Sequence, residues 1–166
     1  MLDLIKKYLV PACATLLAVV AFFLLFGKCV GMGDASWNGF QVIFGASNEN
    51  TKVLTFSFLP FLAFLLLIAG IALVWLNMVP FNHFISAGLL LVAAILFFCF
   101  PTCVSLTPDG EKLLNAVNGI GGLFGADEVK FTAKACLIIS GILNILAAGV
   151  IGTKDYLNVL VNKYIK

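Results

Sequence analysis

Four long apolar runs, separated by polar segments, dominate the pattern of the chain. They lie at residues 8–27, 53–78, 84–100 and 132–151, and their central parts carry no charged residue. A helix needs about 20 mainly apolar residues to cross the hydrocarbon core of a bilayer. Each run is therefore predicted to be a transmembrane helix. Only a short segment with Pro80 separates the second run from the third, which predicts an antiparallel helical hairpin.

The composition agrees with this pattern. Of the 166 residues, 62% are hydrophobic and 11% are charged, whereas a soluble domain is nearer half apolar and a quarter charged. The sequence predicts an all-α membrane protein, with residues 1–166 forming a single integral membrane domain. The formal net charge is only +2, and this excludes the strong basic field of a nucleic-acid-binding protein.

The lysines predict the orientation in the membrane. Lys6 and Lys7 precede the first run, and three further lysines follow the fourth, whereas the loops 28–52 and 101–131 carry more acidic than basic residues. Because cytoplasmic segments are enriched in lysine, we expect both termini in the cytoplasm and both long loops outside. The first run resembles a signal peptide, but it is too long and no Ala-x-Ala site follows it, so a retained helix is expected.

A loop motif occurs twice. The stretch at 37–46 and the stretch at 118–126 share Asn-Gly, an apolar residue, two variable positions, Ile or Leu, and Phe-Gly-Ala. The motif and its flanking residues are Trp37, Asn38, Gly39, Phe40, Phe44 and Gly45 in the first copy, and Asn118, Gly119, Phe124 and Gly125 in the second. The pattern favours two helical hairpins that enter the membrane in the same direction as a parallel repeat. Chance similarity remains the alternative, because Gly and Phe are frequent here.

Both loops are too apolar to be ordinary solvent loops. Residues 40–44 are β-prone, so we expect short strands from the two loops to pair into a small sheet over the helices. Residues 111–117 are expected to form a short helix, with a start signal at 107–109. The aromatic residues are expected to cover the helices or to lie at the bilayer interface. The alternative is a face that binds a partner or a lipid.

The C-terminal tail at 154–166 is amphipathic. Its predicted apolar face consists of Tyr156, Leu157, Leu160, Val161 and Tyr164. Such a helix is expected to lie on the cytoplasmic leaflet, with partner docking as the alternative.

Small and polar residues predict how the helices pack. Ala14 and Ala18 in the first run, and Ala148 and Gly152 at the end of the fourth, are spaced to let helices approach closely, within one chain or between chains. Asn144 is the clearest polar residue in the middle of a span. We expect it to pack between helices, where a hydrogen bond would contribute about 1 kcal/mol.

The candidate chemistry is sparse. Cys29 and Cys103 occupy matching positions at the outer ends of the first and third runs, so a disulfide between them is one hypothesis and plain apolar packing is the other. A thiol enzyme would need a closer pair than Cys99 and Cys103. His83 is the only histidine, so neither a metal site nor a catalytic acid–base pair is predicted. No cofactor motif occurs in the sequence.

The first hairpin resembles small four-helix membrane proteins of low-GC Gram-positive bacteria and their relatives. These carry a similar Trp-x-Gly-x-x-x-Ile-Phe-Gly stretch after the first helix, here Trp37, Gly39, Ile43, Phe44 and Gly45. The resemblance implies a bacterial multi-pass protein and no particular activity. The claudin layout is similar only in topology, because the paired loop cysteines of that family are missing between residues 31 and 52.

These features favour a non-enzymatic accessory or scaffold subunit. Its outward loops and helix faces would bind another membrane protein or further copies of the same chain, within the lipid bilayer and without nucleic acid. The first alternative is a homo-oligomeric pore lined by Ser57, Ser86, Ser140 or Asn144. The second is a membrane thiol–disulfide oxidoreductase.

Overall fold

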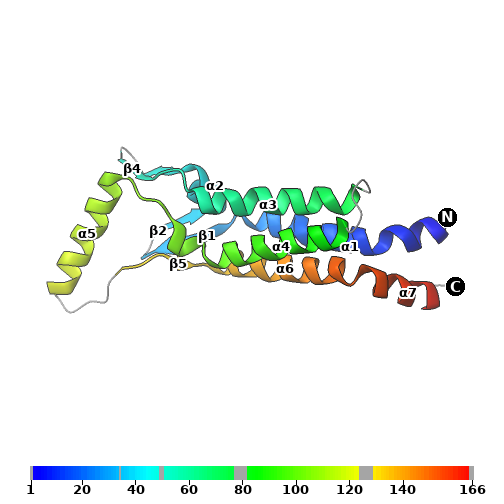
Figure 1. The fold of residues 1–166 in the computed structure, drawn as a ribbon. Helices are drawn as coiled ribbons and strands as arrows, with labels where there is room; N and C mark the ends of the chain where they lie inside the picture. Colours follow the sequence, from blue (N-terminus) through cyan, green and yellow to red (C-terminus); the bar gives the residue numbers. More distant parts are fainter. Residues whose placement is uncertain (1, 34, 49–50, 77–81, 124–128, 165–166) are drawn as a thin grey trace.

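The computed structural model describes residues 2–33, 35–48, 51–76, 82–123 and 129–164. Within these ranges the chain is mostly helical with a small amount of sheet. The long helices α1 (Leu2–Leu24), α3 (Phe58–Trp75), α4 (Asn82–Phe98) and α6 (Ala135–Gly152) lie side by side (Figure 1). Both termini lie at one end of these helices. The strands and the shorter helices before residue 134 form a cap at the other end, made from the described residues of 28–57 and 99–134.

Two of the helices have the length and composition of a membrane span. These are α3 and α6, with 18 residues each. The apolar part of α1, Tyr8–Leu24, and helix α4 are also apolar but shorter. By length and composition, the described helices therefore support two of the four predicted spans.

At its cap end, each long helix is shorter than the predicted span, and the remaining residues form other structure. The segment predicted as a span from residue 53 begins with strand β4 (Thr51–Leu54), and the helix starts only at Phe58. The segment predicted from residue 132 begins with strand β5 (Thr132–Ala133), and Lys134 precedes α6 rather than lying inside it. Apolar composition alone does not separate a buried strand from the end of a helix.

The cap contains a small sheet, as expected, but one of its strands comes from the segment predicted as the fourth span and not from the second loop. Strand β1 (Lys28–Met32) lies in the middle of a three-stranded antiparallel sheet, between β2 (Ala35–Asn38) and β5. Val30 is opposite Trp37 on one side and Ala133 on the other. The sheet thus joins the chain after α1 to the chain before α6.

The strand prediction for residues 40–44 is wrong, because these residues form the short helix α2 (Gly39–Phe44). The side chain of Asn38 accepts a hydrogen bond from the backbone N–H of Gln41, and the side chain of Gln41 accepts one from the N–H of Asn38. This capping box supplies two of the hydrogen bonds that a helix start otherwise lacks. The helix then buries Val42 and Ile43 completely.

The second copy of the loop motif has a different structure. Asn118 and Gly119 lie inside α5 (Pro108–Leu123), and Phe124 and Gly125 fall outside the described residues. The side-chain oxygen of Asn118 accepts the N–H of Val129 at 2.7 Å instead of starting a helix. The helix predicted at 111–117 is confirmed and extends further in both directions. The sequence similarity of the two loops is therefore not matched by a shared conformation.

A hairpin of β3 (Ala46–Asn48) and β4 connects α2 to α3. The chain that leaves the 3-10 turn η1 (Phe100–Cys103) runs antiparallel beside β4. The N–H of Thr55 donates to the carbonyl of Ser105, and the N–H of Thr107 donates to the carbonyl of Val53, both at 3.0 Å. The second loop is thereby attached to the first.

The helices are joined by serine hydroxyls. Ser140 of α6 donates to the carbonyl of Ala21 in α1 at 2.9 Å, and Ser86 of α4 donates to the carbonyl of Gly70 in α3 at 2.7 Å. Asn144 is fully buried, as expected for packing, but neither atom of its amide group has a hydrogen-bond partner among the described residues. Ser86 and Ser140 therefore make hydrogen bonds between helices, whereas the one expected from Asn144 is not found among the described residues.

The predicted small-residue faces pack inside this chain. Ala14 and Ala18 of α1 are buried, as is Ala148 of α6, whereas Gly152 at the end of α6 is half-buried. These close approaches hold the helices of one chain together. Contacts between chains would therefore have to use surfaces other than these small residues.

The tail forms α7 (Lys154–Tyr164), which packs against α1. Of the predicted apolar face, Leu157 and Leu160 are half-buried, whereas Tyr156 is 68% exposed. Figure 1 shows α7 extending the line of α6 beside the first turns of α1. Part of the apolar face expected to rest on the membrane surface therefore contacts the protein itself.

Candidate functional site

The first loop motif mainly holds the cap onto the helices. Trp37 is buried, and its ring lies 5.9 Å from that of Phe131. A Cβ on Gly39 would lie 3.0 Å from the carbonyl oxygen of Leu25, so only glycine fits there without displacement. Phe40 packs its ring 4.6 Å from that of Phe26 in the chain after α1. These residues are therefore structural, and Phe44, at 57% exposure, is the motif residue that reaches the surface.

All five cysteines are unpaired in the structure. Cys29 is buried in β1, where its thiol contacts the carbonyl oxygens of Leu24 and Leu25 at 3.6 and 3.8 Å. Burial raises the pKa of the Cys29 thiol to about 11, which opposes formation of the reactive thiolate. Cys103 ends the η1 turn and is also free, so the disulfide between Cys29 and Cys103 stays a prediction.

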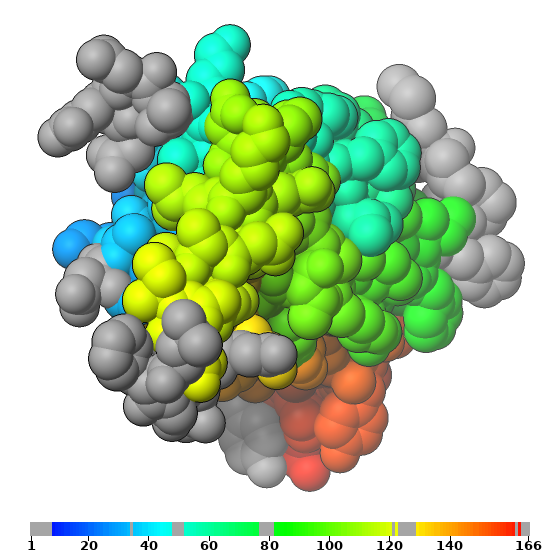
Figure 2. Space-filling model, turned by 90° about the vertical axis from the view of Figure 1, so that its left-hand side faces the viewer, coloured from blue at the N-terminus to red at the C-terminus, as the bar shows by residue number. Residues whose placement is uncertain are grey.

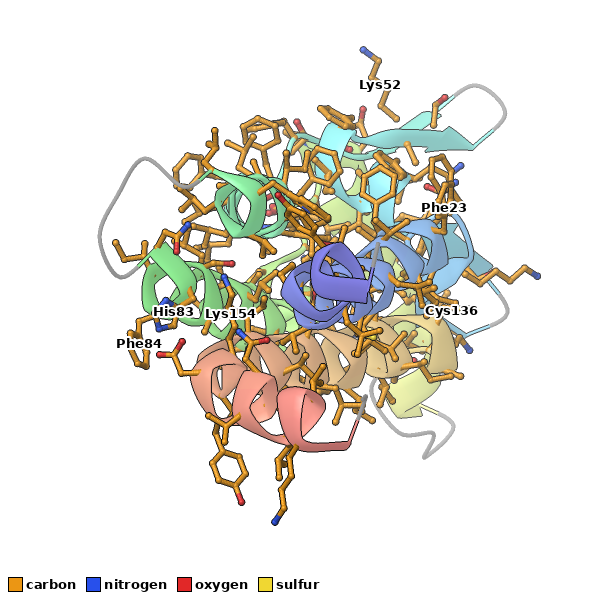
Figure 3. All side chains as sticks on the ribbon, turned by 90° about the vertical axis from the view of Figure 1, so that its right-hand side faces the viewer. Phe23, Lys52, His83, Phe84, Cys136 and Lys154 are labelled. Atoms are coloured by element: carbon orange, nitrogen blue, oxygen red, sulfur yellow. The ribbon has the colours of Figure 1, made fainter. Side chains whose placement is uncertain are left out.

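His83 has a neighbour that the sequence did not indicate. Its Nε2 lies 3.5 Å from the Oδ2 of Asp155, because α7 begins beside the start of α4. Figure 3 shows His83 next to Phe84 at the edge of the helices, and the two rings are 4.2 Å apart. Asp155 is 80% exposed, and the His83 Nε2 makes no hydrogen bond among the described residues, so this is a weak contact. Within the described ranges, no three His, Cys, Asp or Glu side chains gather as metal ligands would.

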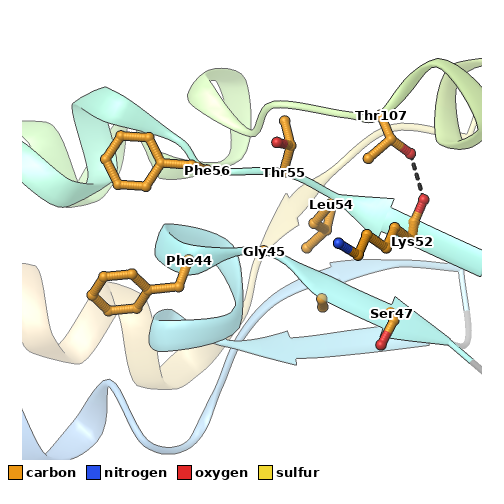
Figure 4. A pocket seen from close by; sticks show the side chains of 9 residues that line it. Phe44, Gly45, Ser47, Lys52, Leu54, Thr55, Phe56 and Thr107 are labelled. Carbon is orange, nitrogen blue, oxygen red and sulfur yellow. Dashed lines mark hydrogen bonds between the residues drawn. The ribbon is translucent and has the colours of Figure 1, made fainter.

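The cap carries a pocket where the two loops meet the start of α3. Its volume is about 310 Å³, and residues of α2, of the hairpin and of the second loop line it (Figure 4). The described residues that line it are Phe44, Gly45, Ala46, Ser47, Lys52, Leu54, Thr55, Phe56 and Thr107. Lys52 is the one charged side chain in this set, and the set contains no acidic residue. The pocket therefore combines a positive charge and hydroxyl groups with two aromatic rings.

Two features fix the shape of this pocket. The Thr107 hydroxyl donates to the carbonyl of Lys52 and accepts the N–H of Gly110 at 3.1 Å. Gly45 has a φ of +99°, and a Cβ there would lie 2.8 Å from the carbonyl oxygen of Leu54. Sequence reasoning did not find the pocket, because Thr107 is 55 residues away from Lys52 along the chain.

Helix α5 presents a row of apolar side chains on its exposed surface. Leu113, Val117 and Ile120 are 50%, 44% and 60% exposed, and their spacing of four and three residues places them on one face. Asn118, on another face of α5, bonds to Val129 in the rest of the cap instead. In Figure 2, α5 crosses the end of the molecule in front of the other described segments. The described part of the cap leaves this apolar row uncovered.

The sequence matches no protein-family model, no curated protein and no solved structure.

Proposed function

We propose that the chain is a multi-pass integral membrane protein in which α1, α3, α4 and α6 all cross the bilayer. The apolar parts of α1 and α4, with 17 residues each, are at the lower limit of the range of about 17–25 residues that spans a bilayer. Both pack against the longer helices. Only 28% of α3 and 39% of α6 is buried, and large apolar side chains cover much of the remainder. A core helix of a soluble protein would be mostly buried, so lipid is the better solvent for these faces.

The lysines support an orientation with both termini in the cytoplasm and the cap outside. Lys6, Lys7, Lys154, Lys163 and Lys166 belong to the terminal segments, and both termini lie at the same end of the helices. The loop segments 28–52 and 101–131 carry four lysines against six acidic residues. This asymmetry follows the positive-inside rule.

Within this arrangement we propose a non-enzymatic accessory or scaffold role, in which the cap binds another membrane protein. The observation that carries this proposal is the exposed row of Leu113, Val117 and Ile120 on α5. In Figure 1 the three-stranded sheet lies between α5 and the long helices, so the row lies beyond the ends of the proposed spans. Apolar side chains held there would face water unless a protein covered them.

The pore alternative has less support. Ser57, Ser86, Ser140 and Asn144 are all fully buried inside the chain. The hydroxyls of Ser86 and Ser140 are used to bond the helices of the same chain. A channel between copies of this fold would therefore need other lining residues.

The thiol-enzyme alternative also has less support. Cys29 is buried with a raised pKa. Cys99 directly precedes η1 and Cys103 ends it, and the two are not bonded to each other. A thiol oxidoreductase needs an accessible thiolate.

Site-specific photocrosslinking in native membranes tests the accessory role. A photoreactive amino acid at Val117 should form one dominant adduct with a different membrane protein, whereas the same group at Lys112, on another side of α5, should not. Replacing Leu113, Val117 and Ile120 with Gln should remove that protein from the complex recovered in mild detergent. Replacing Glu111, Lys112 and Asn115, which are exposed on another side of α5, with Gln is the matched control.

Two results would overturn the accessory role. One is an adduct only with a second copy of this chain, which would favour a homo-oligomer instead. The other is a monomer with no adduct at Val117.

A further inference from the structure

The pocket between the loops has a polar end and an apolar end. Lys52 and Ser47 lie on the hairpin side, and the rings of Phe44 and Phe56 lie on the side of α3 (Figure 4). Figure 4 shows the Lys52 side chain directed to the α3 side of the pocket, and Figure 3 shows its ammonium group extending out from the protein surface. A ligand that fills the pocket must therefore be anionic or polar at one end and apolar at the other.

The apolar end is continuous with the outer surface of α3. Phe44 and Phe56 are 57% and 47% exposed, although each ring packs against Phe61, at 6.1 and 5.3 Å. Phe58 and Leu59, in the first turn of α3, extend this exposed surface along the helix. The rings are thus held in place by the protein while one side of each remains open.

The position of the pocket relative to the proposed spans indicates the class of ligand. It lies where α3 begins, so with the proposed spans it sits at the level of the lipid head groups. Aromatic side chains are enriched at this depth, and a lysine near an anionic membrane surface gains about fivefold in affinity, or about 1 kcal/mol. The volume of about 310 Å³ suits a head group, with the acyl chains left outside along α3.

We propose that this pocket binds the head group of an anionic phospholipid of the outer leaflet. The Lys52 ammonium group pairs with the phosphate, Ser47 and Thr55 are within the same lining to donate hydrogen bonds, and the acyl chains lie against Phe44, Phe56 and the exposed face of α3. Thr107 contributes by fixing the backbone of Lys52. This inference rests on the membrane placement proposed above and is independent of the accessory role of α5.

Native mass spectrometry of the full chain tests the proposal. The protein is purified in neutral detergent and titrated with phosphatidylglycerol or with phosphatidylcholine. One phosphatidylglycerol should be retained at energies that remove the others. Lys52→Gln should weaken retention of that lipid about fivefold and leave phosphatidylcholine unchanged. Lys112→Gln, at an exposed lysine of the same cap, is the matched control and should bind as the original protein does.

A second variant pair tests the apolar end. Phe44→Ser together with Phe56→Ser should weaken both lipids, whereas Phe23→Ser, at an exposed ring outside the pocket, should not. Each variant is first compared with the original protein in thermal stability, so that loss of the fold is recognised.

The outcomes separate the two proposals. Equal lipid binding by the Lys52→Gln and Lys112→Gln variants would overturn the head-group site while leaving the membrane placement intact. Protection of the fold by inorganic phosphate alone, without lipid, would overturn the assignment to a phospholipid. Recovery of the native protein in the soluble fraction would overturn the membrane placement itself.

Discussion

Asn38 and Gln41 cap each other at the start of α2. The Oδ1 of Asn38 accepts the N–H of Gln41 at 2.7 Å, and the Oε1 of Gln41 accepts the N–H of Asn38 at 3.0 Å. This reciprocal pair marks the point where the sheet ends and the helix that buries Val42 and Ile43 begins. The first loop motif therefore encodes a change from strand to helix.

Replacing Asn38 with Ala should lower the free energy of unfolding by about 1 kcal/mol, because the N–H of Gln41 loses its acceptor. The measurement is denaturant unfolding of the full chain in mixed micelles. Asn115→Ala is the control, since Asn115 is exposed on α5 and a helix interior favours Ala over Asn. Equal destabilisation by both changes would show that the capping box contributes nothing.

Gly45 should tolerate substitution less well than Gly33, although both have a positive φ, of +99° and +57°. A Cβ at Gly33 meets nothing within 4 Å, so Gly33→Ala adds only the left-handed backbone strain of about 1–2 kcal/mol. At Gly45 the backbone region is nearly restricted to glycine, and the Cβ would also meet the Leu54 carbonyl oxygen at 2.8 Å. Gly45→Ala should therefore lower the unfolding midpoint more than Gly33→Ala in the same micelles. Equal midpoints would contradict the tight approach of the hairpin.

The sequence predicted well those features that depend on local composition. The apolar runs became the four long helices, and the Thr-Pro-Asp signal at 107–109 became the start of α5. It failed at 40–44, where a capping box and the burial of adjacent residues overrode a β-prone composition. It also extended the predicted spans into β4 and β5, because those residues are apolar whether they pair as strands or continue as helix.

The candidate site could not be predicted for a different reason. Its pocket depends on Thr107 bonding to Lys52, and the His83–Asp155 contact depends on the start of α7 lying beside the start of α4. Such pairs are set by tertiary packing and have no local pattern. The sequence analysis predicted a helix at 111–117 but not the row of Leu113, Val117 and Ile120, whose exposure depends on how few elements pack on α5.

The two buried polar residues of α6 should respond to substitution in opposite directions. Ser140→Ala removes the hydrogen bond to the Ala21 carbonyl and should destabilise the chain by about 0.6 kcal/mol, the average for such bonds in membranes. Asn144→Leu keeps a branched side chain and removes two amide atoms that have no described partner, so it should stabilise the chain by about 1–3 kcal/mol. Steric-trapping measurements in bicelles give both values. Strong destabilisation by Asn144→Leu would mean that the amide group has a partner when the protein is in lipid.

The thiol of Cys29 should be the least reactive of the cap cysteines below pH 9. Burial raises its pKa from 9.0 to about 11, so the folded protein holds the proton more tightly than the unfolded chain does. The resulting contribution to stability is fully present below pH 9 and is lost as the pH rises through about 11. We therefore expect the unfolding midpoint of the original protein to decrease as the pH rises from 9 to 11. In a Cys29→Ala variant, the decrease relative to that variant's midpoint at pH 8 should be smaller.

Alkylation kinetics of single-cysteine variants provide the direct measurement. The variant that retains only Cys29 should react with a small maleimide more slowly than the variant that retains only Cys103, because Cys29 is fully buried whereas Cys103 is partly accessible. After unfolding in strong detergent the two rates should become equal, since the burial that raises the pKa is gone. Rapid labelling of Cys29 in the folded protein at pH 7 would contradict its place in the sheet and would reopen the thiol-enzyme hypothesis.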